Sequence, residues 1–172
     1  MCLADPGLIL VVDDDDSMRA LLAELIQRLF TPELARQELL LKVARDGFEA
    51  VRFAAADRPA LILLDVQMPG KNGIDVFYQL KEEMGALMPV IFFLTGYALE
   101  GDMGEKIHQA LDDGARGYVQ KPIAVEELER LVRGHVLAKQ GGSLPAPAPL
   151  VNPKDSGSSS QTMDARCLRA KA

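Results

Sequence analysis

The sequence predicts a doubly wound α/β domain, in which a five-stranded parallel sheet is covered by helices on both faces. Three observations predict this fold class. Short apolar runs of strand length recur along the chain. Apart from Lys42 in the second run, these runs are continuously apolar instead of alternating with polar residues, which is typical of strands that are covered on both faces. Helical patterns lie between successive runs, and strands that alternate with helices favour right-handed crossovers and a parallel sheet.

The expected strands are the apolar runs, and each is followed by an expected helix. The strands are Leu8–Val12, Leu39–Val43, Leu61–Leu64, Val90–Leu94 and Gly117–Val119. The first helix has apolar residues at i, i+3 and i+4 spacing from Met18 to Leu29, and Asp16 or Ser17 is expected to cap it. The other helices are expected at Gly47–Ala56, Ile74–Met84, Gly104–Asp113 and from Val125 to Val136. His108 and His135 fall in these helical patterns and are expected at the surface.

The composition predicts one folded domain and a tail. The 172 residues, nearly half of them apolar, leave room for one domain, which is expected to span 1–140. From 141 to 172 the chain is rich in Gly, Pro, Ala and Ser. Such a segment cannot bury enough apolar area to offset the entropy of ordering, so a disordered tail is expected there.

Charge and cysteine content argue against several classes of protein. The net charge of −6 argues against a protein that binds nucleic acid or a membrane surface through bulk charge. No apolar run is long enough to span a bilayer, and the opening MCLADPG lacks the features of a signal peptide. Cys2 and Cys167 have no metal-ligand spacing. They favour free thiols in a reducing cytoplasm over a disulfide between the two ends.

Polar residues that can carry chemistry follow four of the expected strands. Asp13 and Asp14 follow the first strand, Asp65 the third, Thr95 the fourth and Lys121 the fifth. The carboxyl ends of parallel strands meet at one edge of a sheet, where ligands bind in open α/β folds. Three carboxylates, a hydroxyl and an ammonium are therefore expected to converge at this edge.

This set of side chains favours a magnesium site that handles a phosphoryl group. Mg²⁺ prefers oxygen ligands and removes the repulsion between clustered carboxylates. Asp65 can then act as a nucleophile toward phosphorus, and Lys121 and Thr95 can hold the phosphoryl oxygens. The backbone carbonyl of Gln67, in the loop after Asp65, is a further candidate metal ligand. Asp15 and Asp16 are expected to be a solvated capping pair outside the site.

Four motifs resemble the receiver domain of bacterial two-component response regulators. They are VVDDD, LLDVQMPGKNG, FLTG and GYVQKP, which occur in the family's order over about residues 8–138. The resemblance implies a flavodoxin-like sheet in the strand order 2-1-3-4-5. It also implies that Asp14, Asp65 and the Gln67 carbonyl bind Mg²⁺ directly and that Asp13 assists through water.

The resemblance further implies how the domain signals. Asp65 would take a phosphoryl group from a histidine kinase or a histidine phosphotransfer protein, and Thr95 and Lys121 would hold it. Tyr118 matches the family's switch residue, and the Lys121–Pro122 peptide bond is expected to be cis. Output would pass to a downstream protein not identified by the sequence, without direct contact with nucleic acid or membrane. Such a domain is not an enzyme beyond its own phosphorylation and dephosphorylation. Tyr97 and Gln67 are expected to tune the hydrolysis rate.

Two segments are longer than is usual for the family. RLFTPELARQE lies between the first helix and the second strand, and TGYALEGDMGEKIHQALDDGARGYVQK lies between the fourth and fifth strands. The second one touches the fourth expected helix, which belongs to the face that signals in this family.

Two other functions compete with the receiver. A phosphatase of the haloacid dehalogenase type would use Asp13 as nucleophile, with Asp15 and Ser17 completing a loose D-x-D-x-T pattern. That family places its lysine before a final acidic pair, whereas Asp112 and Asp113 precede Lys121 here. A degenerate receiver that only scaffolds other proteins is the third possibility.

Overall fold

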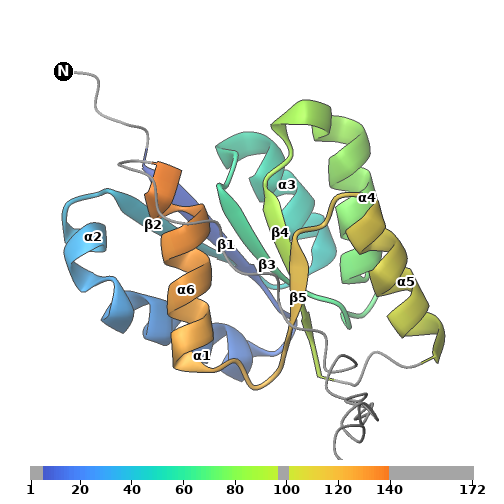
Figure 1. The fold of residues 1–172 in the computed structure, drawn as a ribbon, viewed down its shortest axis with the longest axis horizontal. Coiled ribbons are helices and arrows are strands. Elements are labelled where there is room, and N and C mark those ends of the chain that lie inside the picture. Colours follow the sequence, from blue (N-terminus) through green and yellow to red (C-terminus); the bar gives the residue numbers. More distant parts are fainter. Residues whose placement is uncertain (1–5, 97–100, 140–172) are drawn as a thin grey trace, which may run out of the picture.

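A five-stranded parallel sheet forms the centre of the protein in the computed structural model, which describes residues 6–96 and 101–139 (Figure 1). The strand order is β2-β1-β3-β4-β5, as expected. The strands are β1 (Gly7–Val12), β2 (Leu39–Ala44), β3 (Leu61–Asp65), β4 (Val90–Thr95) and β5 (Gly117–Gln120). All five expected strands are confirmed, and every residue of β3 is buried, as its continuous apolar character predicts.

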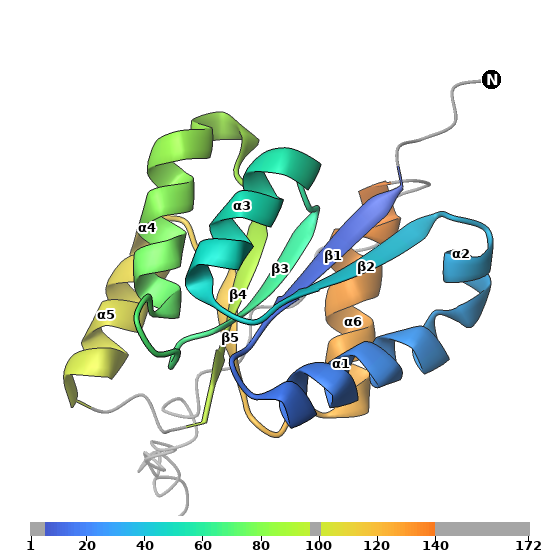
Figure 2. The same cartoon turned by 180° about the vertical axis from the view of Figure 1, so that it is seen from behind.

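Helices cover both faces of the sheet (Figures 1 and 2). They are α1 (Asp16–Leu29), α2 (Thr31–Ala35), α3 (Gly47–Asp57), α4 (Gly73–Met84), α5 (Gly101–Asp112) and α6 (Val125–His135), with short 3₁₀ helices η1 (Gly85–Leu87) and η2 (Leu137–Lys139). The α1 and α6 helices lie on one face, and α3, α4 and α5 lie on the other. The expected α/β fold class is thus confirmed. In the described part of the chain, no helix combines the length and apolar character needed to cross a membrane.

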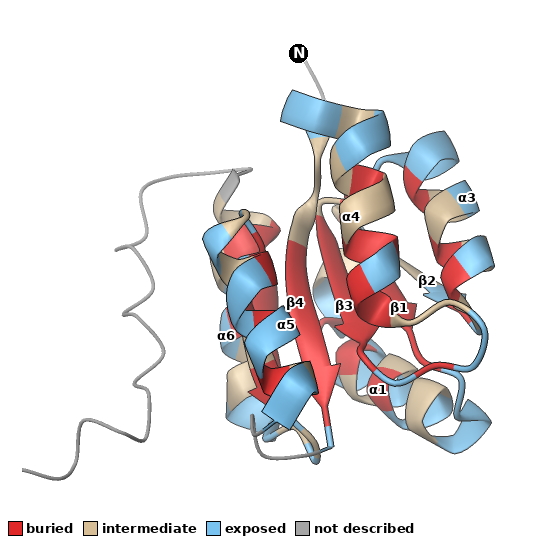
Figure 3. Cartoon of the chain, turned by 90° about the vertical axis from the view of Figure 1, so that its right-hand side faces the viewer, coloured by how far each residue is buried: buried red, intermediate tan, exposed pale blue. Residues whose placement is uncertain are grey.

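The sheet separates two apolar clusters, because successive strand residues point to opposite faces. In β1, Leu10 and Val12 join the cluster under α3, α4 and α5, whereas Ile9 and Val11 join the cluster under α1 and α6. Figure 3 shows the buried strands between exposed helix surfaces.

Three local expectations need correction. The longer segment after α1 contains a sixth helix, α2, which was not expected. The cap of α1 is Asp15 and not Asp16 or Ser17, because the Asp15 side chain accepts hydrogen bonds from the backbone N–H groups of Ser17 and Met18. His135 is buried, at 8% exposure, and its ring lies 5.2 Å from that of Phe92. His108 is exposed, as expected.

Other expectations lie outside the described residues. The expected tail at 141–172, Tyr97 and both cysteines belong to this group. The Lys121–Pro122 peptide bond is described and is cis, as expected.

Candidate functional site

The residues that follow the strands meet at the carboxyl edge of the sheet. The register pairs Val12 with Leu64, so the next residues, Asp13 and Asp65, emerge side by side from neighbouring strands. Thr95 ends β4 and is buried, and its backbone carbonyl accepts a 2.7 Å hydrogen bond from the backbone N–H of Lys121. The sheet therefore brings Asp13 and Lys121, which are 108 positions apart in the sequence, to one small region.

The carboxylates of Asp13, Asp14 and Asp65 form a cluster. One oxygen from each lies within 4.8 Å of the others. Asp13 is completely buried and Asp65 is 5% exposed, whereas Asp14 is exposed to solvent. Two of the three acids are thus held in a region of low dielectric and the third faces the opening of the site.

Lys121 lies between the two buried carboxylates. Its Nζ is 2.5 Å from Oδ2 of Asp13 and 3.1 Å from Oδ1 of Asp65. Its side chain is 16% exposed, so both ion pairs are largely shielded from water. A buried carboxylate requires such a partner, since the charged form is otherwise strongly disfavoured.

Burial and neighbouring charges shift the pKa values of this group. Burial raises the pKa of Asp65, the Lys121 ammonium acts in the opposite direction, and the Asp13 charge raises this pKa further. For Lys121, burial favours a lower pKa, but the hydrogen bonds and charges of Asp13 and Asp65 together outweigh burial and raise the pKa. Burial and the Asp13 charge thus favour the neutral form of Asp65, whereas the positive charge of Lys121 favours its anion.

The loop after β3 positions the Asp65 carboxylate. The backbone N–H of Gln67 donates to Oδ1 of Asp65 over 3.3 Å, and that of Val66 donates to the Leu94 carbonyl over 3.0 Å. The start of α4 packs against this loop, since a Cβ on Gly73 would lie only 2.3 Å from the Asp65 carbonyl oxygen. Sequence reasoning missed this contact, although Gly73 lies within the quoted motif.

The loop after β1 positions Asp13. Its Oδ1 accepts a 3.0 Å hydrogen bond from the backbone N–H of Asp15. The guanidinium of Arg19, on α1, donates to the Asp13 backbone carbonyl over 2.7 Å and also pairs with Asp16. Arg19 was not among the expected site residues, and its spacing from Asp13 alone does not reveal the contact.

Tyr118 lies on β5, away from the carboxylates but on the same face of the sheet as Thr95. It is opposite Phe93, and Phe93 and Thr95 are two positions apart on β4. The Tyr118 ring is half-buried against the cluster under α3, α4 and α5.

The donor set fits a divalent cation. All three carboxylates supply oxygen ligands, which Mg²⁺ prefers over nitrogen or sulfur. With Lys121 paired to two of them, three negative charges and one positive charge leave an excess of two negative charges. The backbone carbonyl of Gln67 is two residues from Asp65 on the adjoining loop. These observations are compatible with metal binding.

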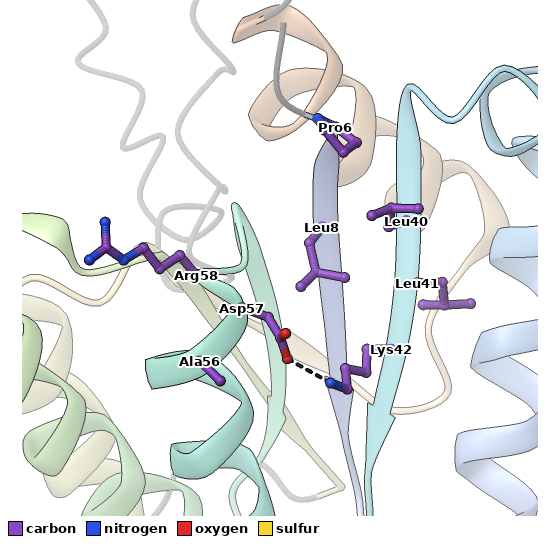
Figure 4. A pocket seen from close by; sticks show the side chains of 8 residues that line it. All are labelled: Pro6, Leu8, Leu40, Leu41, Lys42, Ala56, Asp57 and Arg58. Atoms are coloured by element: carbon purple, nitrogen blue, oxygen red, sulfur yellow. Dashed lines mark hydrogen bonds and ion pairs between the residues drawn. The ribbon is translucent and has the colours of Figure 1, made fainter.

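A pocket of about 700 Å³ lies away from this site (Figure 4). It involves the amino-terminal half of β1, the edge strand β2 and the end of α3. Its lining residues are Pro6, Leu8, Leu40, Leu41, Lys42, Ala56, Asp57 and Arg58. Lys42 and Asp57 form a 2.6 Å ion pair across it. Pro6 and Leu8 precede Asp13 by most of the length of β1, so the pocket does not adjoin the acidic cluster.

The arrangement gives no support to the phosphatase alternative. Asp15 is exposed and caps α1, so its carboxylate is not part of the acidic cluster. Asp113 lies at the far end of α5 and binds Tyr78 and Lys81 instead.

Comparison with known protein families and curated sequences gives a consistent result. The family model described as the response regulator receiver domain matches residues 9–133. The response regulator MprA of Mycobacterium ulcerans is 36% identical over 120 residues, which cover 70% of this chain and 46% of the relative. MprA of Mycobacterium leprae is 34% identical over 125 residues, which cover 73% and 49%. The chain thus spans about half the length of these relatives.

Solved structures show the same fold. A response regulator receiver domain from Bermanella marisrubri is 30% identical, with a TM-score of 0.59 over 76% of this chain and 98% of that one. The receiver domain of the sensor histidine kinase PA1611 from Pseudomonas aeruginosa, solved with a magnesium ion coordinated in its active site cleft, is 24% identical. Its TM-score is 0.62, over 76% of this chain and 98% of that one.

Proposed function

Because this chain belongs to the response regulator receiver domain family, whose role is that of a phosphoacceptor in two-component signalling, we propose that Asp65 is the residue that receives the phosphoryl group. The observation that carries this assignment is the position of Asp65 in the buried cluster, with the Lys121 ammonium 3.1 Å from its carboxylate. Asp13 has the same partner, but it is completely buried. Asp65 remains slightly exposed, and the loop after β3 orients its carboxylate.

The site is proposed to hold Mg²⁺. Asp14, Asp65 and the backbone carbonyl of Gln67 would be its direct protein ligands, and Asp13 would assist through water. When bound, the ion supplies positive charge to the carboxylates and to the incoming phosphoryl oxygens. The likeness to a receiver domain solved with magnesium in its active site cleft supports the choice of this metal.

The proposed reaction is an in-line transfer. An oxygen of Asp65 attacks phosphorus, the new O–P bond forms an acyl phosphate, and the P–N bond of a partner's phosphohistidine breaks. The electron pair of that bond stays on the imidazole nitrogen that leaves. Lys121 then holds a phosphoryl oxygen, and the Thr95 hydroxyl donates a hydrogen bond to another. Hydrolysis of the acyl phosphate returns Asp65 to its carboxylate form.

Phosphorylation is proposed to change the surface of the domain. The acyl phosphate carries close to two negative charges where the Asp65 carboxylate carried one, and its phosphoryl oxygens attract the Thr95 hydroxyl. Tyr118, on the same face of the sheet, would then move inward behind Thr95. The phosphoryl group would thus favour one of two existing states. We propose a histidine kinase or a histidine phosphotransfer protein as the donor and a further protein as the target.

Phosphotransfer from a labelled donor tests the assignment. Wild-type protein should take up label in the presence of Mg²⁺, and Asp65→Asn should take up none. Asp13→Asn should reduce labelling through weaker metal binding without moving the label elsewhere. Uptake by Asp65→Asn together with complete loss in Asp13→Asn would refute the assignment. Peptide mapping of the labelled wild-type protein locates the modified residue directly.

The same protein can be tested for the scaffold alternative. Mg²⁺ with beryllofluoride, which mimics a phosphoryl group on a carboxylate, should shift the NMR signals of Thr95 and Tyr118 in wild-type protein. It should not shift them in Asp65→Asn. A wild-type spectrum that never responds would favour a domain that only binds partners.

A further inference from the structure

Arg19 has an unusual environment for an arginine near the start of a helix. It is in the first turn of α1, and only 15% of its side chain is exposed. The guanidinium folds back beyond the start of the helix. Its Nη1 donates to the backbone carbonyl of Asp13 over 2.7 Å, and its Nη2 pairs with the exposed carboxylate of Asp16.

The helix itself does not explain this placement. Cations stabilise the carboxyl end of a helix and are unfavourable at its amino end. Arg28 shows the ordinary arrangement, because it is in the last turn of α1, is 76% exposed and pairs with Glu24 one turn earlier. Covering a guanidinium also carries a cost that its partners must offset. The contacts of Arg19 therefore point to a role in the loop that carries Asp13 and Asp14.

The three clustered carboxylates are not held equally. Asp13 is fixed by Lys121 and by the backbone N–H of Asp15. Asp65 is fixed by Lys121 and by the backbone N–H of Gln67. The carboxylate of Asp14 is exposed, and no hydrogen bond or ion pair joins it to another residue within the described part of the chain. Its direction therefore depends on the backbone from which it projects.

Arg19 holds that backbone. The carbonyl of Asp13 and the N–H of Asp14 belong to one planar peptide group. A donor that holds the carbonyl oxygen restrains the orientation of this plane, and with it the direction in which the Asp14 side chain leaves the chain. We propose that Arg19 is a positioning residue for divalent-cation binding, which directs the Asp14 carboxylate toward Asp13 and Asp65 through the Asp13–Asp14 peptide group. This inference rests on the proposed metal site.

A positioning role and a purely electrostatic role of Arg19 predict opposite changes in metal affinity when Arg19 is replaced. Arg19 is a cation beside a cation site, so its charge alone opposes metal binding. Removing that charge would tighten metal binding if Arg19 acted only through its field. Removing a positioning contact loosens a ligand and weakens binding, and the loss of such supporting contacts typically lowers metal affinity by about tenfold or more.

The test measures Mn²⁺ and Mg²⁺ affinity by calorimetric titration of the full chain, with no phosphoryl donor present. Arg19→Gln should bind each ion about tenfold more weakly than wild type. The matched control is Arg28→Gln, which removes the same charge from the same helix and should bind as wild type does. Thermal unfolding without metal shows whether each variant folds. Arg19→Lys serves if Arg19→Gln does not fold, and it should also bind more weakly, because an ammonium lacks the fork geometry of the guanidinium.

A double-mutant cycle with Asp14 tests whether Arg19 acts through this ligand. Asp14→Asn should weaken binding by itself, and adding Arg19→Gln to it should cause little further loss, since the two residues act through one ligand. Unchanged or tighter binding in Arg19→Gln, or in Arg19→Lys if that variant is needed, overturns the inference. Fully additive losses in the double variant also overturn it. Failure of the wild type to bind either ion would instead refute the proposed metal site.

Discussion

Substitution of Gly73 by alanine tests whether the loop after β3 is held as tightly as its geometry indicates. Gly73 begins α4, directly beside the backbone of Asp65. A Cβ at this position would lie 2.3 Å from the Asp65 carbonyl oxygen, 3.0 Å from its carbonyl carbon and 3.1 Å from the Val66 Cα. All three atoms belong to the backbone, so no side chain can rotate to make room.

The expected cost follows from that overlap. The Cβ falls short of an ordinary carbon–oxygen contact by about 1 Å, so α4 or the strand end must shift. Overpacking of this kind costs about 1–3 kcal/mol, and the contact with backbone places Gly73→Ala near the upper end. For a domain of this size, about 3 kcal/mol corresponds to a melting temperature lower by about 10 °C.

The assay is thermal and urea unfolding, followed by the phosphotransfer measurement on the folded protein. Gly134→Ala is the matched control, because Gly134 is in α6 and its added Cβ would meet nothing within 4 Å. That control should be more stable by about 0.5–1 kcal/mol, as for other glycines inside helices. A Gly73→Ala protein that is as stable as wild type and accepts a phosphoryl group at the wild-type rate would refute this reasoning.

Three further substitutions test the contacts of Lys121, Asp15 and Asp113. Lys121→Ala should still bind Mg²⁺, because the three carboxylates remain, but the NMR spectrum of this variant should not respond to beryllofluoride. A response like that of wild type would contradict the proposed contact between Lys121 and the phosphoryl group. Asp15→Ala should lower the free energy of unfolding by about 1 kcal/mol in urea titrations, because the cap of α1 is lost, and an unchanged value would argue against this cap. Hydrogen bonds from Lys81 and then Tyr78 lower the pKa of Asp113, so the folded protein binds this proton less tightly than the unfolded chain does. The ionised Asp113 carboxylate therefore stabilises the folded protein above the ordinary aspartate pKa of 3.8, and this stabilisation is lost as the pH falls through the lower pKa of the folded state. Asp113→Asn should make the free energy of unfolding less dependent on pH in that acidic range. An unaltered pH dependence would contradict the lowered pKa of Asp113.

The sheet and the acidic cluster were predictable because most strands are continuous apolar runs and four of them end in, or are followed by, a polar residue. The order of Asp13, Asp65, Thr95 and Lys121 along the chain then determines which side chains reach the carboxyl edge. Asp15, Asp16 and Ser17 were all candidates for the cap of α1, since four aspartates in succession give the same local signal, and only the hydrogen bonds of Asp15 identify it as the cap.

Other features were missed for different physical reasons. The α2 helix has five residues, too few for a periodic pattern, although Pro32 and Glu33 stand at its start as they often do in helices. His135 lies at the helical spacing of the buried positions Leu128, Leu131 and Val132, so its position in the sequence indicated burial. It was expected at the surface because histidine is a polar residue. The contacts of Arg19 and Gly73 depend on how a helix approaches a strand end, which local sequence does not specify.

The division of the apolar side chains between the two faces has a consequence for how the domain can diversify. Neighbouring strand residues such as Leu10 and Val11 belong to different clusters, and the two clusters have no member in common. Substitutions confined to the cluster under α3, α4 and α5 therefore change no side chain of the cluster under α1 and α6. Each side can evolve its own recognition properties while the strand ends between them keep one shared chemistry.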